Sequence, residues 1–434
     1  MENIQLPEKI PIYELDMVKN LISAVLGRAP AQILMGSFRT AQLYYGINAL
    51  NQISGFLEPK LDKEERRVLI ITDDFTEKYA SQVIEVLSTI EAESKVWAGV
   101  KPEGPIDTIE AAAEVCKEFK PTVFIAIGGG SVMDSAKAIM IRYEKPEANF
   151  NHIIGLEPLG LRKKVKYLIA CPTTSGTGSE VTSAAMLTDI SRDPPKKLAV
   201  SHSEIIPDVA ILHTDFVKDM PPFLTMATGL DALAHSAGAY VSSWGGPLND
   251  ALNIAAIKEI LRYLPRAYKY GAKDLEAREK MQFATTMAGM GFSNSKVGLD
   301  HGLGHSFGKI FNVHHGFSVG LFLPYTVAYT AKISDRWKDL CPVFGVISEG
   351  KERKELLTAL LQAIKDFIHS MGGAVCVKEM KNPVISREDY MDKIDLLASY
   401  AEKDAVDLLA PRWMYKETYK RIFEYAWDGR DIDF

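Results

Sequence analysis

Short hydrophobic segments alternate with amphipathic ones through the first half of the chain. Segments that favour strands, most of them rich in Val and Ile, occupy residues 33–35, 68–71, 93–97, 123–127, 167–170 and 209–212. Residues 79–91 and 106–119 lie between such segments and carry hydrophobic side chains at helical spacing. Hydrophobic strands separated by helices predict a parallel sheet with helices on both faces.

The pattern changes near residue 215, and from there to Phe434 helical periodicity dominates. The segment Met220-Pro-Pro222 stops any element that precedes it. We therefore predict an α/β domain over residues 1–214 and an all-helical domain over residues 215–434. Residues 16–28 form a further amphipathic helix, which is expected to pack on the sheet or to contact a second subunit.

Composition narrows the class of protein. The 434 residues carry a net charge of −6 and no domain-scale basic surface, which argues against nucleic acid as a partner. The four cysteines are widely spaced without a Cys-x-x-Cys pair, as expected of buried thiols in a reducing compartment. We find no signal peptide and no stretch long enough to span a bilayer, and therefore expect a cytoplasmic protein without a membrane partner.

Histidines and one carboxylate suggest a metal site in the helical region. Asp231 and His235 are four residues apart, so a helix would present both on one face. Four of the nine histidines fall within fifteen residues, at His301, His305, His314 and His315. Three imidazoles and a carboxylate suit Zn²⁺ or Fe²⁺. The alternative for the first pair alone is a solvated surface pair.

Glycines within the histidine cluster favour its interpretation as a metal site. Gly302, Gly304, Gly308 and Gly316 lie within it. Each costs a helix about 1 kcal/mol relative to Ala. Such a cost is expected where two backbones approach closely or where a cavity must stay open.

Two loops after predicted strands favour a cofactor with phosphates. Gly128, Gly129 and Gly130 precede a predicted helix, where backbone amides and the helix dipole can bind a phosphate. The alternative is a capping box made by Ser131 and Asp134. The following strand leads into a second loop over residues 171–180, which is rich in Ser, Thr and Gly.

A third loop places Asp73 and Asp74 directly after the strand 68–71. A carboxylate at this point can accept the ribose hydroxyls of NAD and repel the 2′-phosphate of NADP. The alternative is a cap of the following helix.

In order, these motifs resemble the iron-containing alcohol dehydrogenases. The matching segments are Gly-Gly-Gly-Ser-x-x-Asp, Pro-Thr-Thr-x-Gly-Thr-x-x-Glu, Gly-x-Asp-Ala-x-x-His and His-x₃-His-x₉-His-Gly. The resemblance implies a Rossmann-like NAD(P)-binding domain of the kind found in dehydroquinate synthase, followed by an all-α metal-binding domain.

The resemblance also implies roles for individual residues. The implied metal ligands are Asp231, His235, His301 and His315, holding one Fe²⁺ with Zn²⁺ as the alternative. His305 corresponds to a histidine near the nicotinamide, where it could relay a proton or orient a ligand. The implied cofactor-binding residues are Asp73, Gly129, Gly130, Ser131, Asp134, Thr173, Thr174, Thr177 and Lys197. Asp73 corresponds to the residue that favours NAD(H) over NADP(H).

The chain departs from the family pattern at several positions. His213 and Thr214 replace Asp-Pro after the last strand, and His314 replaces a Pro before the last ligand. Lys296 and Asp300 place charges where the family is often apolar or small. None of these departures changes the four implied ligands.

The expected reaction is metal-assisted hydride transfer that interconverts an alcohol and an aldehyde or ketone with NAD(H). The expected partners are a small-molecule alcohol or aldehyde and further copies of the chain, in a homodimer or larger homo-oligomer. The alternatives are a lyase or synthase of the same fold that uses NAD transiently and a non-catalytic NAD-binding protein. Intact metal ligands argue against the non-catalytic alternative.

Overall fold

A computed structural model describes residues 38–153, 158–191, 196–404 and 410–434. The predicted helix over residues 16–28 and the predicted strand over residues 33–35 lie outside the described residues. The described residues form two compact units. One contains Phe38–Ala232 and Arg262–Ser293, and the other contains Leu233–Leu261 and Asn294–Phe434.

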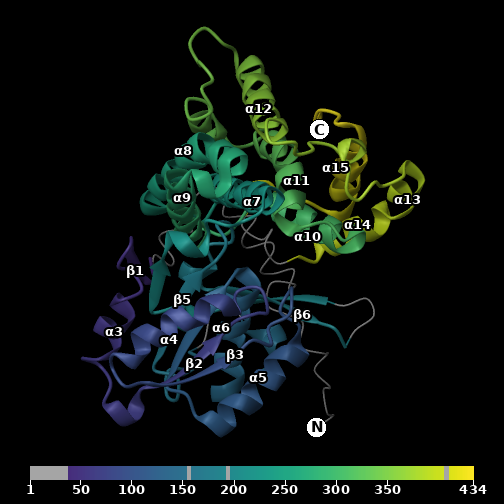
Figure 1. The fold of residues 1–434 in the computed structure, drawn as a ribbon. Helices are drawn as coiled ribbons and strands as arrows, with labels where there is room; N and C mark the ends of the chain where they lie inside the picture. The colour runs from purple at the N-terminus through teal and green to yellow at the C-terminus, as the bar shows by residue number, and fades with distance from the viewer. Residues whose placement is uncertain (1–37, 154–157, 192–195, 405–409) are drawn as a thin grey trace, which may run out of the picture. The chain divides into compact units, whose positions relative to one another are not determined.

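The first unit is built on a six-stranded sheet in which every neighbouring pair is parallel (Figure 1). Its strands are β1 (Gln42–Tyr45), β2 (Arg67–Ile71), β3 (Glu93–Trp97), β4 (Val123–Gly128), β5 (Tyr167–Pro172) and β8 (Val209–Leu212). Their order across the sheet is β1-β8-β5-β4-β2-β3. This confirms the predicted parallel sheet and the strands at 68–71, 93–97, 123–127, 167–170 and 209–212.

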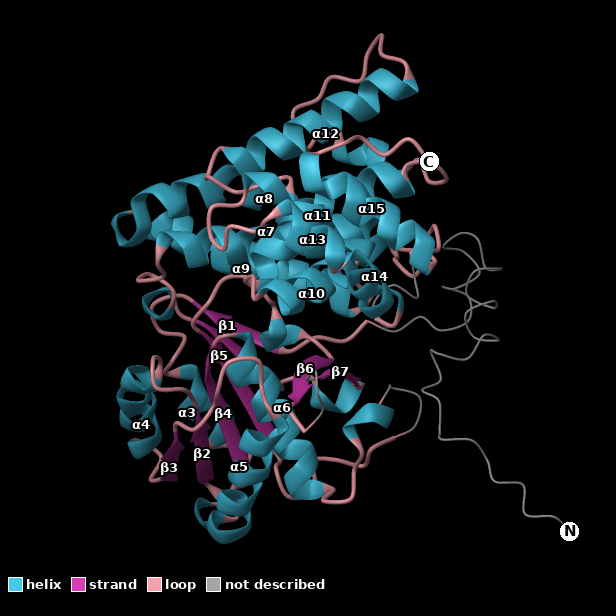
Figure 2. Cartoon of the chain, turned by 90° about the vertical axis from the view of Figure 1, so that its right-hand side faces the viewer, coloured by secondary structure: helices cyan, strands magenta, loops and turns pink. Residues whose placement is uncertain are grey.

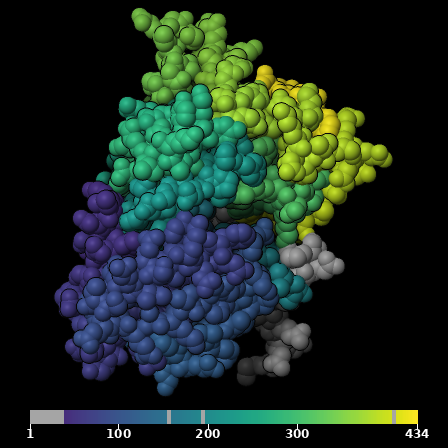
Figure 3. All heavy atoms as spheres, viewed as in Figure 1, coloured from purple at the N-terminus to yellow at the C-terminus, as the bar shows by residue number. Residues whose placement is uncertain are grey.

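Helices cover both faces of this sheet (Figure 2). They are α3 (Gln52–Leu57), α4 (Ala80–Ser88), α5 (Ile106–Phe119) and α6 (Gly130–Glu144). Successive strand residues point to opposite faces, so Leu69 packs with α5 and α6 while Ile70 packs with α3 and α4. Burial on both faces explains why these strands are continuously hydrophobic in the sequence. In Figure 3 the purple to blue atoms of this unit form a continuous surface.

Three strands were not predicted from the hydrophobic pattern. β1 lies at the edge of the sheet and has no fully buried residue. β6 (Ala184–Asp189) and β7 (Lys196–Ser201) form a separate antiparallel pair that mixes buried and half-buried residues. Mixed polarity hides such strands among loop-like sequence.

Described residues after Phe216 contain helices and no strand, which confirms the predicted all-helical region. The helices are α7 (Pro222–Val241), α8 (Pro247–Tyr270), α9 (Leu275–Ser293), α10 (Leu299–Phe311), α11 (His315–Thr330), α12 (Arg353–His369), α13 (Arg387–Asp392), α14 (Ile394–Glu402) and α15 (Lys416–Asp428). Both α7 and α8 contribute residues to each compact unit. The domain boundary near residue 214 stays a prediction.

Two further expectations concern the whole chain. All four cysteines are buried free thiols, as their spacing predicted. Among the described residues, no helix is long and apolar enough to cross a membrane.

Candidate metal centre and cofactor loops

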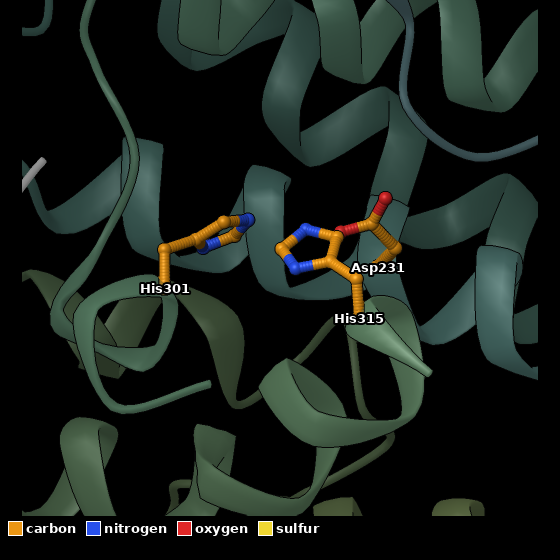
Figure 4. A group of neighbouring side chains, drawn as sticks. All are labelled: Asp231, His301 and His315. Carbon is orange, nitrogen blue, oxygen red and sulfur yellow. The ribbon is translucent and has the colours of Figure 1, made fainter. Parts of the chain in front are cut away.

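Three of the four predicted metal ligands lie together. Asp231 comes from α7, His301 from α10 and His315 from the first turn of α11. One potential ligand atom from each lies within 4.8 Å of the others, and Figure 4 shows the three side chains turned toward one another. Asp231 and His301 are each 2% exposed, so these polar groups are held inside the protein.

Glycine is required where α10 packs against α11. A Cβ atom on Gly304 would lie 2.5 Å from Val319 Cγ1, and one on Gly308 would lie 2.9 Å from the Val313 carbonyl oxygen. Asn312 then ends α10 in the left-handed region with a φ of 52°, which allows the chain to turn into α11. The close approach predicted from the glycines therefore exists, and it brings the helices of His301 and His315 together.

His235 and His314 differ in their placement. His235 stacks on His301 with ring centroids 4.4 Å apart, although it is not part of the group of three. His314 precedes α11, is exposed, and is likewise outside the group. His235 therefore lies beside the candidate ligand His301, and its role as a fourth ligand stays a prediction.

The group fits a divalent metal by its chemistry and spacing. Ligand atoms held tetrahedrally at about 2.1 Å from one ion lie roughly 3.4 Å from each other. The potential ligand atoms of this group lie within 4.8 Å of one another, which is compatible with that spacing. Imidazole nitrogen with one carboxylate suits Fe²⁺ and Zn²⁺. A carboxylate and two imidazoles that converge, two of the three buried, are an arrangement that a divalent ion can stabilise.

His305 lies next to this group and has a carboxylate partner of its own. Its Nδ1 is 2.7 Å from Asp404 Oδ2, and its ring lies 5.0 Å from that of His315. Asp404 was not predicted from the sequence, because it is 99 residues away and no motif marks it.

The glycine-rich turn after β4 packs tightly against the loop after β5. A Cβ on Gly130 would lie 2.7 Å from Thr177 Cγ2, and one on Gly129 would lie 3.2 Å from Thr174 Cγ2. These glycines are therefore needed for the contact between the two predicted cofactor loops. Thr173 joins the same contact, since its backbone N–H donates to the Gly128 carbonyl at 2.9 Å.

The predicted alternative for this turn, a capping box, does not form. α6 begins after Gly129 without a side-chain cap. Ser131 Oγ instead accepts from the Glu103 backbone N–H at 3.1 Å. Asp134 accepts from Ser179 Oγ at 2.6 Å and from the Met186 backbone N–H at 2.9 Å. Asp134 therefore holds the second loop and β6 in place.

Lys137 is fully buried beneath these loops. Its Nζ donates to Ser179 Oγ at 2.8 Å, to Thr182 Oγ1 at 3.1 Å and to the Ala184 carbonyl at 2.7 Å. Burial lowers the pKa of Lys137 to about 8, an effect that the nearby carboxylates oppose.

Two carboxyl groups accompany this lysine. Burial raises the pKa of Asp134 and that of Glu180, which accepts a hydrogen bond from Thr286 Oγ1 at 2.7 Å. Sequence reasoning did not find Lys137, although it lies three residues after Asp134 on the same helix.

Lys197 and Asp73 complete the predicted cofactor residues. Lys197 lies on β7, and its Nζ is 3.1 Å from Glu103 Oε2. Glu103 is also the residue whose backbone N–H donates to Ser131. Asp73 Oδ1 accepts from the backbone N–H groups of Phe75 and Thr76 at 3.0 and 2.9 Å. Asp73 therefore holds the turn before the short 3₁₀ helix Glu77–Tyr79, whose N-cap is Thr76 without a side-chain cap, so the capping alternative for Asp73 does not form.

Comparisons with known proteins agree with this architecture. The family model described as iron-containing alcohol dehydrogenase matches residues 40–214, and the model of the C-terminal part of the Fe-containing alcohol dehydrogenase family matches residues 225–427. The chain is 33% identical over 398 residues to an NADPH-dependent butanol dehydrogenase of Clostridium saccharobutylicum, covering 90% of this chain and 98% of that protein.

Two further relatives extend the comparison. A bifunctional aldehyde-alcohol dehydrogenase of Escherichia coli (strain K12) is 30% identical over 402 residues, which covers 86% of this chain and 44% of that longer protein. An alcohol dehydrogenase structure from Oenococcus oeni has a TM-score of 0.81 at 27% identity, covering 91% of this chain and 100% of that one. The chain belongs to the iron-containing alcohol dehydrogenases. It is an oxidoreductase that interconverts alcohols and aldehydes, and its family implies a metal and a nicotinamide cofactor.

Proposed function

We propose that this protein is a metal-dependent alcohol dehydrogenase that prefers NAD(H) and holds one divalent ion with Asp231, His235, His301 and His315. The observation that carries the proposal is the convergence of buried Asp231, buried His301 and half-buried His315, with one potential ligand atom from each within 4.8 Å of the others. Fe²⁺ is the proposed ion, with Zn²⁺ as the alternative that the same donors accept. The family-model matches end at 214 and begin at 225, which supports the domain boundary proposed near residue 214.

The chemistry divides between the bound groups and the side chains. Held by these residues, a bound metal would supply Lewis-acid polarisation of the alcohol or carbonyl oxygen, and a bound nicotinamide would supply the hydride chemistry. Asp231 contributes a negative charge that offsets part of the ion's charge. The helices α7, α10 and α11 hold the ligands in fixed positions, which reduces the reorganisation needed during the reaction.

His305 is proposed to move the proton that the alcohol releases. Its Nδ1 bonds to Asp404, so the carboxylate orients the ring. The other ring nitrogen, Nε2, is then the atom that exchanges the proton. Because the ring contacts that of His315, this exchange would take place beside the proposed ligands.

The two packed loops are proposed to bind the cofactor phosphates. Gly129 and Gly130 place backbone amides at the start of α6, where the helix dipole is positive. Ser131, Thr173, Thr174 and Thr177 add hydroxyl groups on the same loops. Lys197 adds a positive charge near the Ser131 segment. Asp134 is proposed to act on the cofactor indirectly, by fixing the second loop.

Variants of neighbouring histidines test the ligand assignment. His301→Ala and His315→Ala are expected to lose stoichiometric metal and activity together, while NAD still binds because the cofactor loops are unchanged. His314→Ala is the matched control and should retain metal close to that of the unmodified protein. His305→Gln should retain metal but lose activity with every alcohol.

The measurements are metal content by elemental analysis, NAD binding by calorimetry, and activity with primary alcohols, diols and aldehydes after loading with Fe²⁺ or Zn²⁺. Stoichiometric metal in His301→Ala would contradict the ligand set. No net NADH formation with any alcohol would favour a lyase that uses NAD transiently.

A further inference from the structure

Asp300 is a buried carboxylate in direct contact with a proposed metal ligand. It precedes His301 on α10, and its side chain is 2% exposed. His301 Nδ1 lies 2.6 Å from Asp300 Oδ1, and Thr326 Oγ1 donates to Oδ2 at 3.3 Å. A carboxylate at this depth is costly unless its oxygens are bonded, so these two contacts are needed to keep it there.

The surrounding backbone makes room for this carboxylate. A Cβ atom on Gly298 would lie 2.7 Å from Asp300 Oδ2, and one on Gly238 would lie 3.3 Å from the same oxygen. The backbones at Gly238 and Gly298 also touch, since a Cβ on Gly238 would lie 2.6 Å from the Gly298 nitrogen. A side chain at Gly298 would clash with the carboxylate, and one at Gly238 would clash with the Gly298 backbone beside it. Gly298 therefore leaves the room that Asp300 occupies.

The local field also favours the carboxylate at this position. Asp300 is in the first turn of α10, where the helix dipole is positive. It borders a small pocket lined mainly by apolar and small residues of α7, α10 and α11, such as Ala237, Val241 and Leu323. Among the described residues, the hydrogen bond with His301 Nδ1 is the one made by Oδ1.

We propose that Asp300 is a positioning residue that fixes His301 as a metal ligand. This inference rests on the proposed function. A carboxylate only accepts hydrogen bonds, so His301 must carry its proton on Nδ1 and present the Nε2 lone pair to the metal. The same bond fixes the orientation of the ring. Asp300 departs from the family pattern, and in this proposal its charge supports metal binding through His301.

The bond has an electrostatic consequence as well as a geometric one. A carboxylate that accepts from Nδ1 increases the electron density at Nε2 and makes the imidazole a stronger donor. A divalent ion with Asp231 and Asp300 also sums to zero net charge, which favours its retention in a buried site. Loss of such an outer partner typically weakens metal affinity by about 10–100-fold.

Three variants separate charge from orientation. Asp300→Asn keeps an oxygen that can accept from His301 Nδ1 but removes the charge, whereas Asp300→Leu removes both. Asp339→Asn is the control for loss of one carboxylate in the same unit, where Asp339 accepts from Tyr240 at 2.7 Å. Each metal-free protein is titrated with Zn²⁺ against a competing chelator. The visible spectrum of the Co²⁺-loaded form reports the ligand field.

Asp300→Asn is expected to weaken Zn²⁺ binding by about 10-fold and to shift the Co²⁺ spectrum, and Asp300→Leu to weaken binding by about 100-fold. Asp339→Asn should bind as the unmodified protein does. Thermal unfolding of the metal-free proteins checks that each variant is folded, and if Asp300→Leu is not, Asp300→Asn alone decides. Zn²⁺ affinity of Asp300→Asn within threefold of the unmodified protein, with an unchanged Co²⁺ spectrum, overturns the inference.

His301→Ala distinguishes this failure from failure of the proposed function. If His301→Ala loses Zn²⁺ while Asp300→Asn binds normally, the ligand assignment stands and the role of Asp300 is rejected. If His301→Ala also binds Zn²⁺ normally, both the ligand assignment and the role of Asp300 are rejected.

Discussion

Asp73 uses one of its two carboxylate oxygens to hold the turn that follows β2. Oδ1 accepts from the Thr76 hydroxyl at 2.8 Å as well as from two backbone N–H groups, whereas none of these bonds involves Oδ2. Holding this turn and contacting a cofactor are therefore compatible roles for one side chain. The negative charge itself disfavours a 2′-phosphate, while the oxygens can accept ribose hydroxyls.

Replacing Asp73 with Asn separates the charge from the turn. The amide oxygen of Asn can accept the same hydrogen bonds, so the turn is expected to persist while the repulsion of NADP(H) is lost. The ratio of kcat/KM for NAD(H) over NADP(H) should fall by about tenfold, which corresponds to roughly 1.4 kcal/mol. Steady-state kinetics with both cofactors measure this ratio.

Asp74→Asn is the matched control, because Asp74 is the exposed neighbour. It should leave the cofactor ratio nearly unchanged. A larger effect at Asp74 would assign the repulsion to that residue instead. The Clostridium relative is named as NADPH-dependent, so the cofactor preference of the unmodified protein must be measured as well. A preference for NADP(H) in the unmodified protein would reject the role given to Asp73.

Individual site residues differ in how far the sequence could predict them. Asp231 and His301 belong to short motifs with helical spacing, and both occur in the group that the structure brings together. Asp404 lies just after α14 and Thr326 lies on α11, and no motif in the sequence marks either residue as a partner of His305 or Asp300. The sequence shows Asp300 as a charged departure from the family pattern, whereas its hydrogen bond with His301 becomes evident only in the structure.

At the scale of elements, the sequence predicts best what is buried on all sides. β4 and β5 are continuously hydrophobic because helices cover both faces of the sheet, and α5 matches its predicted bounds at Ile106–Phe119. β1 lies at an edge and β6 is half-buried, so neither has a distinct hydrophobic period. The packing of Gly130 against Thr177 joins two loops that the sequence could only describe separately.

Lys137 joins α6 to the loop after β5 and to β6. Lys137→Met would remove three hydrogen bonds and leave Asp134 and Glu180 without their buried cation. We expect the free energy of unfolding to fall by roughly 3–5 kcal/mol, as is typical when one partner of a buried ion pair is removed. Urea denaturation followed by circular dichroism measures this loss.

The control for Lys137→Met is Lys117→Met on α5. Lys117 pairs with Glu114 at an exposed position, and exposed pairs contribute about 0–1 kcal/mol. Adding Asp134→Asn to Lys137→Met should recover part of the loss, because it removes one of the uncompensated carboxylates. A loss below about 1 kcal/mol for Lys137→Met would mean that the network contributes little to stability.

At the scale of the whole molecule, buried titratable groups connect stability to pH. Burial raises the pKa of Asp134 and Glu180 and lowers that of Lys137 and His213, so in each case it favours the neutral form. Each group makes stability depend on pH in the range between its pKa values in the folded and unfolded states. An ordinary histidine titrates near neutral pH, so we expect His213 to contribute to the response in that range.

His213 follows β8 and packs against Phe216 with ring centroids 5.3 Å apart. Burial lowers its pKa in the folded state below the ordinary value of about 6.5, although Asp215 opposes the shift. As pH falls below about 6.5, the unfolded chain therefore binds a proton that the folded protein does not. Stability contributed by neutral His213 is thus present above pH about 6.5 and decreases as pH falls toward the folded pKa.

His213→Gln should therefore lose less stability than the unmodified protein between pH 7 and pH 5, because glutamine has no proton to bind. Urea denaturation midpoints at half-unit pH steps measure the difference between the two proteins. At pH 8 both side chains are neutral, so the difference there records only the change in packing against Phe216 and serves as the reference. The difference in midpoint should then shift in favour of His213→Gln as the pH is lowered. A difference that stays constant from pH 8 to pH 5 would show that His213 does not control the acid response of this protein.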